Sequence, residues 1–448
     1  MEMEAKANSF QALDIDVTSS IKNDQVQEYG HTTAHTIDHD SWKQVGLLLA
    51  TCFNCGWILS FSNLIMVPLG WKWGITALAS VGLFTAYANW LLAGFHFIDG
   101  RRFIRYKDIM GFLFGRHMYY ITWINQFFIF FLGNMGFIIL GGRGLKDINA
   151  IFNGSPLRLQ YHIIITGVAY FAFALIVPNM SSMRVWLGVS LVLTLGYIGF
   201  MLPVAVNDGK SNRSRSYEIE GSTTDKVFNA LGAIATIVVC NTSGMVLEIQ
   251  STLRKPAVNN MRKALSVQYT AGLAMYYGVC IIGYWAYGTS VSDYLPNNLT
   301  RPKWAKVVVN SGVYLQNIVS QNMFLQPVHE ALDTKFLKLD KSINSRQNLQ
   351  RRFVLRGLLF TVTTFVAAAL PFIGDFINFL GSFALIPLTF IFPSMIFLKV
   401  KGNTANAAQK AWHWAIIIFC SLLAVATTAS AVRLIVNNVT RYHFFANT

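Results

Sequence analysis

The chain has 448 residues, of which 53% are hydrophobic and only 13% are charged, and its mean hydropathy is +0.42. These values exclude a typical soluble protein and predict an all-α membrane protein, because apolar stretches of about 20 residues recur between short polar connections. The formal net charge of +15 does not indicate a nucleic-acid partner, because the basic residues are spread over those connections.

Residues 1–40 are predicted to be a disordered cytosolic tail. They contain eight acids and lack the apolar core of a signal peptide. His31, His35 and His39 have a four-residue spacing that would suit a metal site on a helix. The adjacent Gly30 and the lack of cysteine partners favour a solvated tail instead.

All five cysteines lie inside apolar stretches, so a framework of extracellular disulfides is not expected. Cys52 and Cys55 have the C-x-x-C spacing of redox and zinc sites, but no second pair accompanies them, and a role as small packing residues is favoured. The sequence also lacks a Walker A motif and a recognisable selectivity-filter loop. No metal, no cofactor and no enzymatic activity are predicted.

Eleven apolar stretches are long enough to cross the hydrocarbon core as helices. They lie near residues 42–69, 73–97, 117–141, 160–178, 185–206, 227–250, 264–288, 304–329, 353–371, 376–398 and 411–436. We therefore expect a ten-helix core at 41–398, followed at 399–448 by a linker, the eleventh helix and the C-terminus.

Basic residues in the connections predict the direction of the helices. The side of the N-terminus receives 23 Lys and Arg residues and the opposite side receives 13. This excess predicts a cytosolic N-terminus and an external C-terminus. Glycosylation sequons at Asn153, Asn212, Asn298 and Asn438 all fall on the external side, in agreement with that direction.

Small and polar residues interrupt two of the predicted helices. The first interruption is Asn54-Cys55-Gly56-Trp57, followed by Ser60-Phe61-Ser62-Asn63, and the second is Asn241-Thr242-Ser243-Gly244. The two helices are five apart, so each is the first of a five-helix set, and the two sets run in opposite directions. Matched interruptions in such sets predict a solute site near the bilayer midplane. The alternative is that the small residues only let helices pack closely.

Interrupted helices offer free backbone groups to a solute. Amides near Cys55 to Trp57 would bind a carboxylate, and carbonyls near Asn241 to Gly244 would bind an ammonium group. The ring faces of Trp57 and Phe61 would suit a cationic amine. The predicted substrate-binding residues are Asn54, Cys55, Gly56, Trp57, Ser60, Phe61, Asn134, Asn241, Thr242, Ser243, Gly244 and Gln321. Asn134 and Gln321 have an alternative role, in which they only join neighbouring helices.

Glu248 is the acid that lies well within a predicted span, about 6 Å past Gly244 along a helix. A charge is costly there, so a functional role is expected. An apolar cavity favours the neutral carboxyl, which would take up a proton with the solute and release it inside. The alternative is an acid that reaches the cytosolic edge or pairs with Arg254 or Lys255.

Four other titratable residues lie near the ends of predicted spans, where water is available. They are His96, His329, Glu330 and Asp375. Surface roles are expected for His329, Glu330 and Asp375. A proton relay through His96 is the less favoured interpretation of that residue.

Short motifs run in order through the chain after residue 41. They include Met66-Val67-Pro68-Leu69-Gly70-Trp71, Arg105-Tyr106-Lys107-Asp108, Gly136-Phe137-Ile138-Ile139-Leu140, Glu248-Ile249-Gln250, Gly283-Tyr284-Trp285-Ala286-Tyr287-Gly288, Asp333-Thr334-Lys335-Phe336, Leu370-Pro371-Phe372 and Trp412-His413-Trp414. With these motifs the chain resembles the amino acid/auxin permease family, and within it the plant proline transporter branch. Ser60 and Asn63 stand where that branch usually has glycines, and Ser243 is inserted where it usually reads Asn-Thr-Gly.

The resemblance implies eleven spans in the five-plus-five inverted repeat of the leucine-transporter fold, with helices 1 and 6 broken. It implies the import of proline and related compatible solutes, such as glycine betaine and γ-aminobutyrate, together with protons. We expect the protein in the plasma membrane, with an internal membrane as the alternative. The partners are then a small zwitterionic solute, protons and the lipid bilayer, and the proton gradient is the driving force. Glu248 corresponds to the Glu-Ile-Gln motif of the family. The alternatives are another amino-acid-like solute or a nutrient sensor that does not transport.

Overall fold

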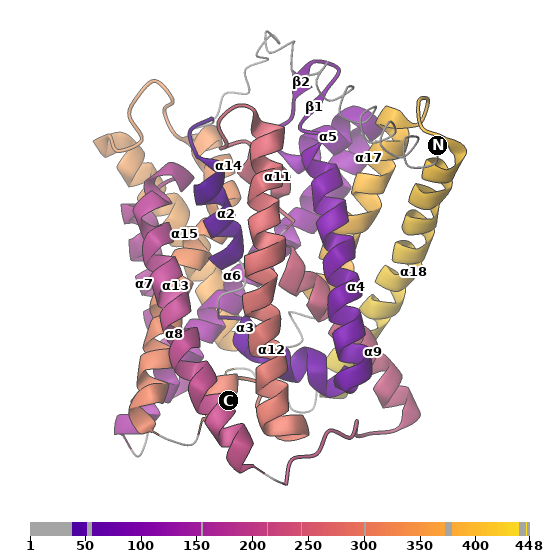
Figure 1. Ribbon diagram of the computed structural model, residues 1–448. Coiled ribbons are helices and arrows are strands. Elements are labelled where there is room, and N and C mark those ends of the chain that lie inside the picture. The colour runs from indigo at the N-terminus through magenta and orange to yellow at the C-terminus, as the bar shows by residue number, and fades with distance from the viewer. Residues whose placement is uncertain are drawn as a thin grey trace.

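The computed structural model describes residues 38–51, 56–153, 156–212, 214–242, 244–299, 302–371, 379–438 and 445. These residues form long helices that run side by side in one bundle (Figure 1). Nine helical stretches of the described residues are long and apolar enough to cross a membrane. The prediction of an all-α membrane protein is confirmed.

The first half of the chain contains α2 (Trp42–Thr51), α3 (Ile58–Phe61), η1 (Ser62–Met66), α4 (Val67–Ala93), β1 (Phe97–Ile98), β2 (Arg101–Arg102), α5 (Tyr106–Phe114), α6 (Arg116–Phe152), α7 (Leu159–Ile176), η2 (Met180–Met183) and α8 (Arg184–Ser211). The second half contains α9 (Thr223–Asn241), α10 (Val246–Gln250), α11 (Ala257–Val267), η3 (Gln268–Gly272), α12 (Leu273–Tyr287), η4 (Gly288–Ser290), η5 (Leu295–Asn298), α13 (Lys303–Phe324), α14 (Gln326–Phe336), α15 (Arg346–Ala369), η6 (Leu380–Leu385), η7 (Pro387–Ile391), α17 (Phe392–Lys401) and α18 (Ala407–Asn438). The strands β1 and β2 form one antiparallel hairpin.

The count of eleven spans stays a prediction. The expected spans 42–69 and 73–97 meet inside one continuous stretch, Ile58–Ala93, where Gly70 has a φ of +64° and kinks the chain. That backbone conformation favours glycine. α13 is not among the nine apolar stretches, because buried amide side chains line it and lower its hydropathy.

Three helix boundaries differ from the prediction. α6 continues to Phe152 rather than ending near 141. α15 begins at Arg346 rather than near 353, because the side chain of Ser345 accepts a hydrogen bond from Asn348 N at 3.4 Å and caps the helix. The expected helix at 304–329 is divided between α13 and α14 at Leu325.

The connections that were predicted to be cytosolic lie at one end of the bundle. β1, β2, α5 and α14 lie at the top of Figure 1, together with the adjoining ends of α11 and α17. Arg102 donates two hydrogen bonds of 2.7 Å to the Asp38 carboxylate, and Arg105 pairs with Glu330 at 2.9 Å. These pairs join distant parts of the chain at this end. Which side of a membrane it faces stays a prediction.

Candidate functional site

The described part of α2 ends at Thr51, beside the first expected interruption. Side chains from two later helices donate to carbonyls of its last two described residues. Gln316 Nε2 on α13 donates to Thr51 O at 2.7 Å, and the Tyr276 hydroxyl on α12 donates to Ala50 O. Asn54 and Cys55 lie outside the described residues. The end of α2 is thus held by helices far away in the sequence.

Gly56 and Trp57 form a turn just before α3 and lie close to α6 and α13. A Cβ atom on Gly56 would overlap the side chains of Leu140 and Asn317, so a glycine is needed for this close approach. The Trp57 indole is 5% exposed and lies over Gly136 on α6. Trp57 Nε1 is buried and has no hydrogen-bond partner among the described residues.

Two amide side chains face each other between α6 and α13. Gln321 Nε2 donates to Asn134 Oδ1 at 2.7 Å, and both residues are fully buried. Asn134 Nδ2 and Gln321 Oε1 have no hydrogen-bond partner within the described part of the chain. Buried polar atoms are nearly always paired in proteins. With Trp57 Nε1, this region therefore offers two unsatisfied donors and one unsatisfied acceptor to a small solute.

Ser60 and Phe61, two other predicted substrate residues, are buried. The contacts around them lie on the side of α12. Phe61 O accepts a hydrogen bond from Cys280 Sγ at 3.3 Å, and Ser62 Oγ donates to Val279 O at 3.4 Å. The contacts described for this segment therefore join α3 and η1 to α12 and not to the amide pair.

The second interruption lies between α9 and α10. The carbonyl of Asn241, the last residue of α9, already accepts hydrogen bonds from other side chains. Asn241 O accepts hydrogen bonds from Gln268 Nε2 at 3.1 Å and from the Tyr269 hydroxyl at 3.0 Å. The side chain of Thr242 accepts a hydrogen bond from Asn89 Nδ2 at 3.3 Å. The carbonyl of Asn241 is therefore not free for a solute, in contrast to the expectation. Ser243 lies outside the described residues.

Gly244 turns the chain from α9 into the short helix α10. Its φ of +69° lies in the left-handed region, which favours glycine. A Cβ atom at this position would lie 3.0 Å from Ile129 on α6 and 3.2 Å from Leu385. The turn therefore packs directly against α6 and brings Glu248 of α10 to the same helix.

Glu248 is buried, with 8% of its surface exposed. Its Oε1 atom accepts hydrogen bonds from Tyr106 N at 2.9 Å and from Gln126 Nε2 at 2.8 Å, whereas Oε2 has no partner among the described residues. Both donors are neutral. The alternative pairing with Arg254 is not observed, because Arg254 Nε donates to His39 O at 2.9 Å. A carboxyl in this setting is costly to keep charged, so it is a natural site for a proton.

α6 connects the two polar regions. Gln126 contacts Glu248, and Asn134, eight residues further along the same helix, contacts Gln321. Eight residues of α-helix span about 12 Å. The carboxyl and the amide pair therefore lie along one continuous helix, close enough for one small solute and one proton to occupy neighbouring positions.

Comparison with known proteins identifies the family. A family model described as transmembrane amino acid transporter protein matches residues 38–434. The chain belongs to this family. The amino acid/auxin permease resemblance of the sequence is thereby confirmed, and the chain is a membrane transporter of an amino-acid-like solute rather than an enzyme. The assignment to the proline branch stays a prediction.

Three relatives of this permease come from Arabidopsis thaliana. The chain is 29% identical to GABA transporter 1 over 425 residues, which cover 89% of this chain and 93% of the relative. It is 27% identical to Lysine histidine transporter-like 1 over 395 residues, with 85% of both chains covered. It is 29% identical to Lysine histidine transporter-like 6 over 395 residues, with 85% of this chain and 88% of the relative covered.

Gly136 gives the permease a direct test of the packing around Trp57. A methyl group in Gly136→Ala would overlap the indole, and overpacking of this kind costs roughly 1–3 kcal/mol. We expect uptake of the transported solute to fall about tenfold with unchanged surface expression. Gly188→Ala is the control, because no atom lies within 4 Å of its Cβ position. Equal uptake by the two variants would show that the position of Trp57 does not matter for transport.

The structure changes the role expected for His329 and bears on the proton relay considered for His96. His329 is fully buried and stacks on Phe360, so the expectation of a surface role is wrong. His96 is also buried and its Nε2 accepts a hydrogen bond from Arg102 Nε at 3.0 Å. Burial, with the charge of Arg102, lowers the pKa of His96 to about 3. His96 therefore stays neutral at physiological pH, and this does not favour a proton relay through it.

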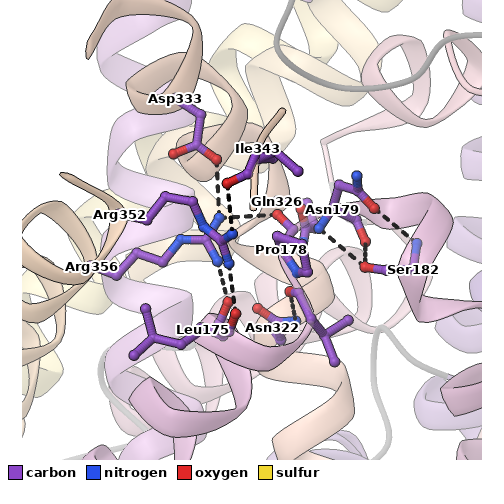
Figure 2. Close-up of polar contacts among 12 residues, drawn as sticks. Leu175, Pro178, Asn179, Ser182, Asn322, Gln326, Asp333, Ile343, Arg352 and Arg356 are labelled. Carbon is purple, nitrogen blue, oxygen red and sulfur yellow. Dashed lines mark hydrogen bonds and ion pairs between the residues drawn. The ribbon is translucent and has the colours of Figure 1, made fainter. Parts of the chain in front are cut away.

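α15 carries a pair of buried arginines that were not among the predicted site residues. Arg352 and Arg356 were counted as charges of a cytosolic connection, but they are 0% and 1% exposed. Figure 2 shows both guanidinium groups pointing at the C-terminal end of α7, with Asp333 nearby. Their four-residue spacing, which puts them on one face of a helix, was the signal in the sequence.

The two arginines cap α7. Arg352 Nη2 donates to Leu175 O at 2.6 Å, and Arg356 donates to Ala174 O and, at 3.0 Å, to Pro178 O. These carbonyls belong to the last turn of the helix and to the residues just after it, where backbone acceptors lack helical partners and the helix dipole favours cations. Arg356 also pairs with Asp333 at 3.0 Å. The cluster fixes α15 to α7 at this end of the bundle.

Proposed function

We propose that the chain imports a small zwitterionic solute such as proline, glycine betaine or γ-aminobutyrate together with a proton. The observation that carries the proposal is Glu248, a buried carboxyl that receives only neutral hydrogen-bond donors in the second helix interruption. In this proposal the protein lies in the plasma membrane with its N-terminus in the cytosol. The name of GABA transporter 1, which aligns with 89% of this chain over 93% of its own length, supports a solute of this class.

The solute binds between α3, α6 and α13 in this proposal. Its carboxylate accepts hydrogen bonds from Trp57 Nε1 and Asn134 Nδ2, and its nitrogen faces Gln321 Oε1 and the ring of Trp57. These side-chain groups are neutral, so they suit a solute whose own charges cancel. A lysine-like solute would bring an additional cation for which this group of side chains offers no carboxylate.

Proton coupling follows from the position of Glu248. A proton on Oε2 removes the unfavourable buried charge, so the protonated form is stable while the site is closed to water. When α3 and the α9–α10 turn move with α4 and α12 relative to α6, α7, α13 and α15, Glu248 meets water on the cytosolic side and releases the proton. The solute and the proton then leave together.

Uptake into yeast cells that lack their own transporters tests this function. Radiolabelled proline, glycine betaine, γ-aminobutyrate and lysine are supplied separately at acidic and at neutral external pH. We expect uptake of at least one of the three zwitterions, stimulated at acidic pH, and no uptake of lysine. Uptake of lysine alone would show that the solute is cationic and that the assignment of a zwitterionic solute is wrong. Surface expression without uptake of any solute would contradict transport and favour a sensor.

A further inference from the structure

The basic residues between Lys335 and Arg356 divide into two groups with different surroundings. Arg352 and Arg356 point inward and cap α7, as described above. The other five are exposed: Lys335, Lys338, Lys341, Arg346 and Arg351. We propose that these five residues, which we call the basic loop face, bind the headgroups of anionic phospholipids. This inference does not depend on the identity of the solute.

The loop that carries the basic residues has a defined shape. Asn348 is 1% exposed and lies inside it. Its Oδ1 accepts a hydrogen bond from Lys338 N at 3.0 Å, and its Nδ2 donates to Lys338 O, Lys341 O and Ser342 O at 3.0, 3.3 and 3.0 Å. Arg351 Nη1 donates to Phe336 O at 2.6 Å and joins the end of α14 to α15. The loop therefore presents its lysines in a fixed arrangement, which lowers the entropy cost of binding.

The basic loop face carries positive charge that the protein does not neutralise. Asp340 is the one acid between residues 335 and 351, and within the described structure none of the five basic side chains forms an ion pair. Lys341 Nζ donates to a neutral group, Gln347 Oε1, at 3.1 Å. Five cations with one nearby acid complement a negatively charged surface.

Apolar residues place this charge at the edge of the bilayer. Arg346, Leu349 and Phe353 follow one another on α15 at spacings of three and four, so they share one helix face. Leu349 and Phe353 are 45% and 55% exposed, and α15 is one of the helices able to cross a membrane. Leu339 in the loop is also exposed, at 48%. Exposed apolar residues next to lysines and arginines suit the boundary between acyl chains and headgroups.

Native mass spectrometry of the full chain tests the proposal. The protein is purified from nanodiscs that contain phosphatidylcholine with or without phosphatidylserine, and the bound lipids are counted. The test variant is Lys338→Gln/Lys341→Gln/Arg346→Gln. The control is Lys399→Gln/Lys401→Gln/Lys410→Gln, which removes the same charge from exposed residues around the α17–α18 connection. A basic residue near an anionic surface contributes about 1 kcal/mol, which is roughly a fivefold effect on binding.

We expect wild type and control to retain phosphatidylserine, and the test variant to bind it at least about tenfold less. Retention should fall as the salt concentration rises, whereas phosphatidylcholine binding should not change. Equal phosphatidylserine retention by the test and control variants would overturn the proposal and leave the charges with a role in topology alone. Inorganic phosphate that displaces phosphatidylserine when sodium chloride of the same ionic strength does not would also overturn it, because the site would then bind free phosphate rather than lipid.

Discussion

Glu248→Gln is expected to abolish the stimulation of uptake by acidic external pH. Gln keeps the shape of the side chain and an oxygen that can accept the hydrogen bonds from Tyr106 N and Gln126, but it cannot carry the transported proton. The pH dependence of radiolabelled uptake in yeast measures this effect. We expect uptake at acidic pH to fall at least about tenfold, to the level seen without a proton gradient.

The matched control for this prediction is Glu220→Gln, which makes the same chemical change at an exposed position outside α9 and α10. It should keep the pH dependence of the wild type. If Glu248→Gln retained full acid stimulation with normal surface expression, Glu248 would not be the coupling group. Its buried carboxyl would then have a structural role between α5, α6 and α10.

Arg356→Gln is expected to destabilise the folded protein strongly. The substitution removes the ion pair with the buried Asp333 and the cation that donates to Ala174 O and Pro178 O. Removing one member of a buried ion pair typically costs about 3–5 kcal/mol. Fluorescence-detected size exclusion of detergent extracts should show a loss of the monodisperse peak, and thermal unfolding should begin at a lower temperature.

Two further variants separate the causes. Arg158→Gln removes an arginine from an exposed position near the other end of α7 and should behave like the wild type. Arg356→Gln/Asp333→Asn removes both charges, so it should recover part of the lost stability. A monodisperse, fully stable Arg356→Gln would contradict the assignment of this arginine as the clamp between α15 and α7.

The sequence predicts long helices and the position of the second interruption. Long apolar runs specify the spans, and α9 ends at Asn241, where the pattern places the second break. The partners of the site residues are not visible in such local patterns. Gln126 and Glu248 are 122 residues apart, and Gln321 and Asn134 are 187 apart. Only the packing of α6 against α10 and α13 brings these side chains together.

Whether the backbone groups at the breaks are free to bind a solute could be predicted only in part. The rule that an interrupted helix exposes carbonyls holds for an isolated helix. In the folded chain, Gln268 and Tyr269 reach the Asn241 carbonyl from the next hairpin of helices.

A count of charges in the connections between helices treats every arginine as exposed. It therefore missed that Arg352 and Arg356 turn into the bundle, because α15 begins before both residues.

Measuring whether protons enter with the solute is the most direct test of the proposed proton coupling. Purified protein is reconstituted into vesicles that contain a pH-sensitive dye, and proline, glycine betaine or γ-aminobutyrate is added outside without an imposed gradient. We expect the interior to acidify with wild type and Glu220→Gln but not with Glu248→Gln. Uptake of radiolabelled solute by the wild type with no change in internal pH would contradict proton coupling through Glu248.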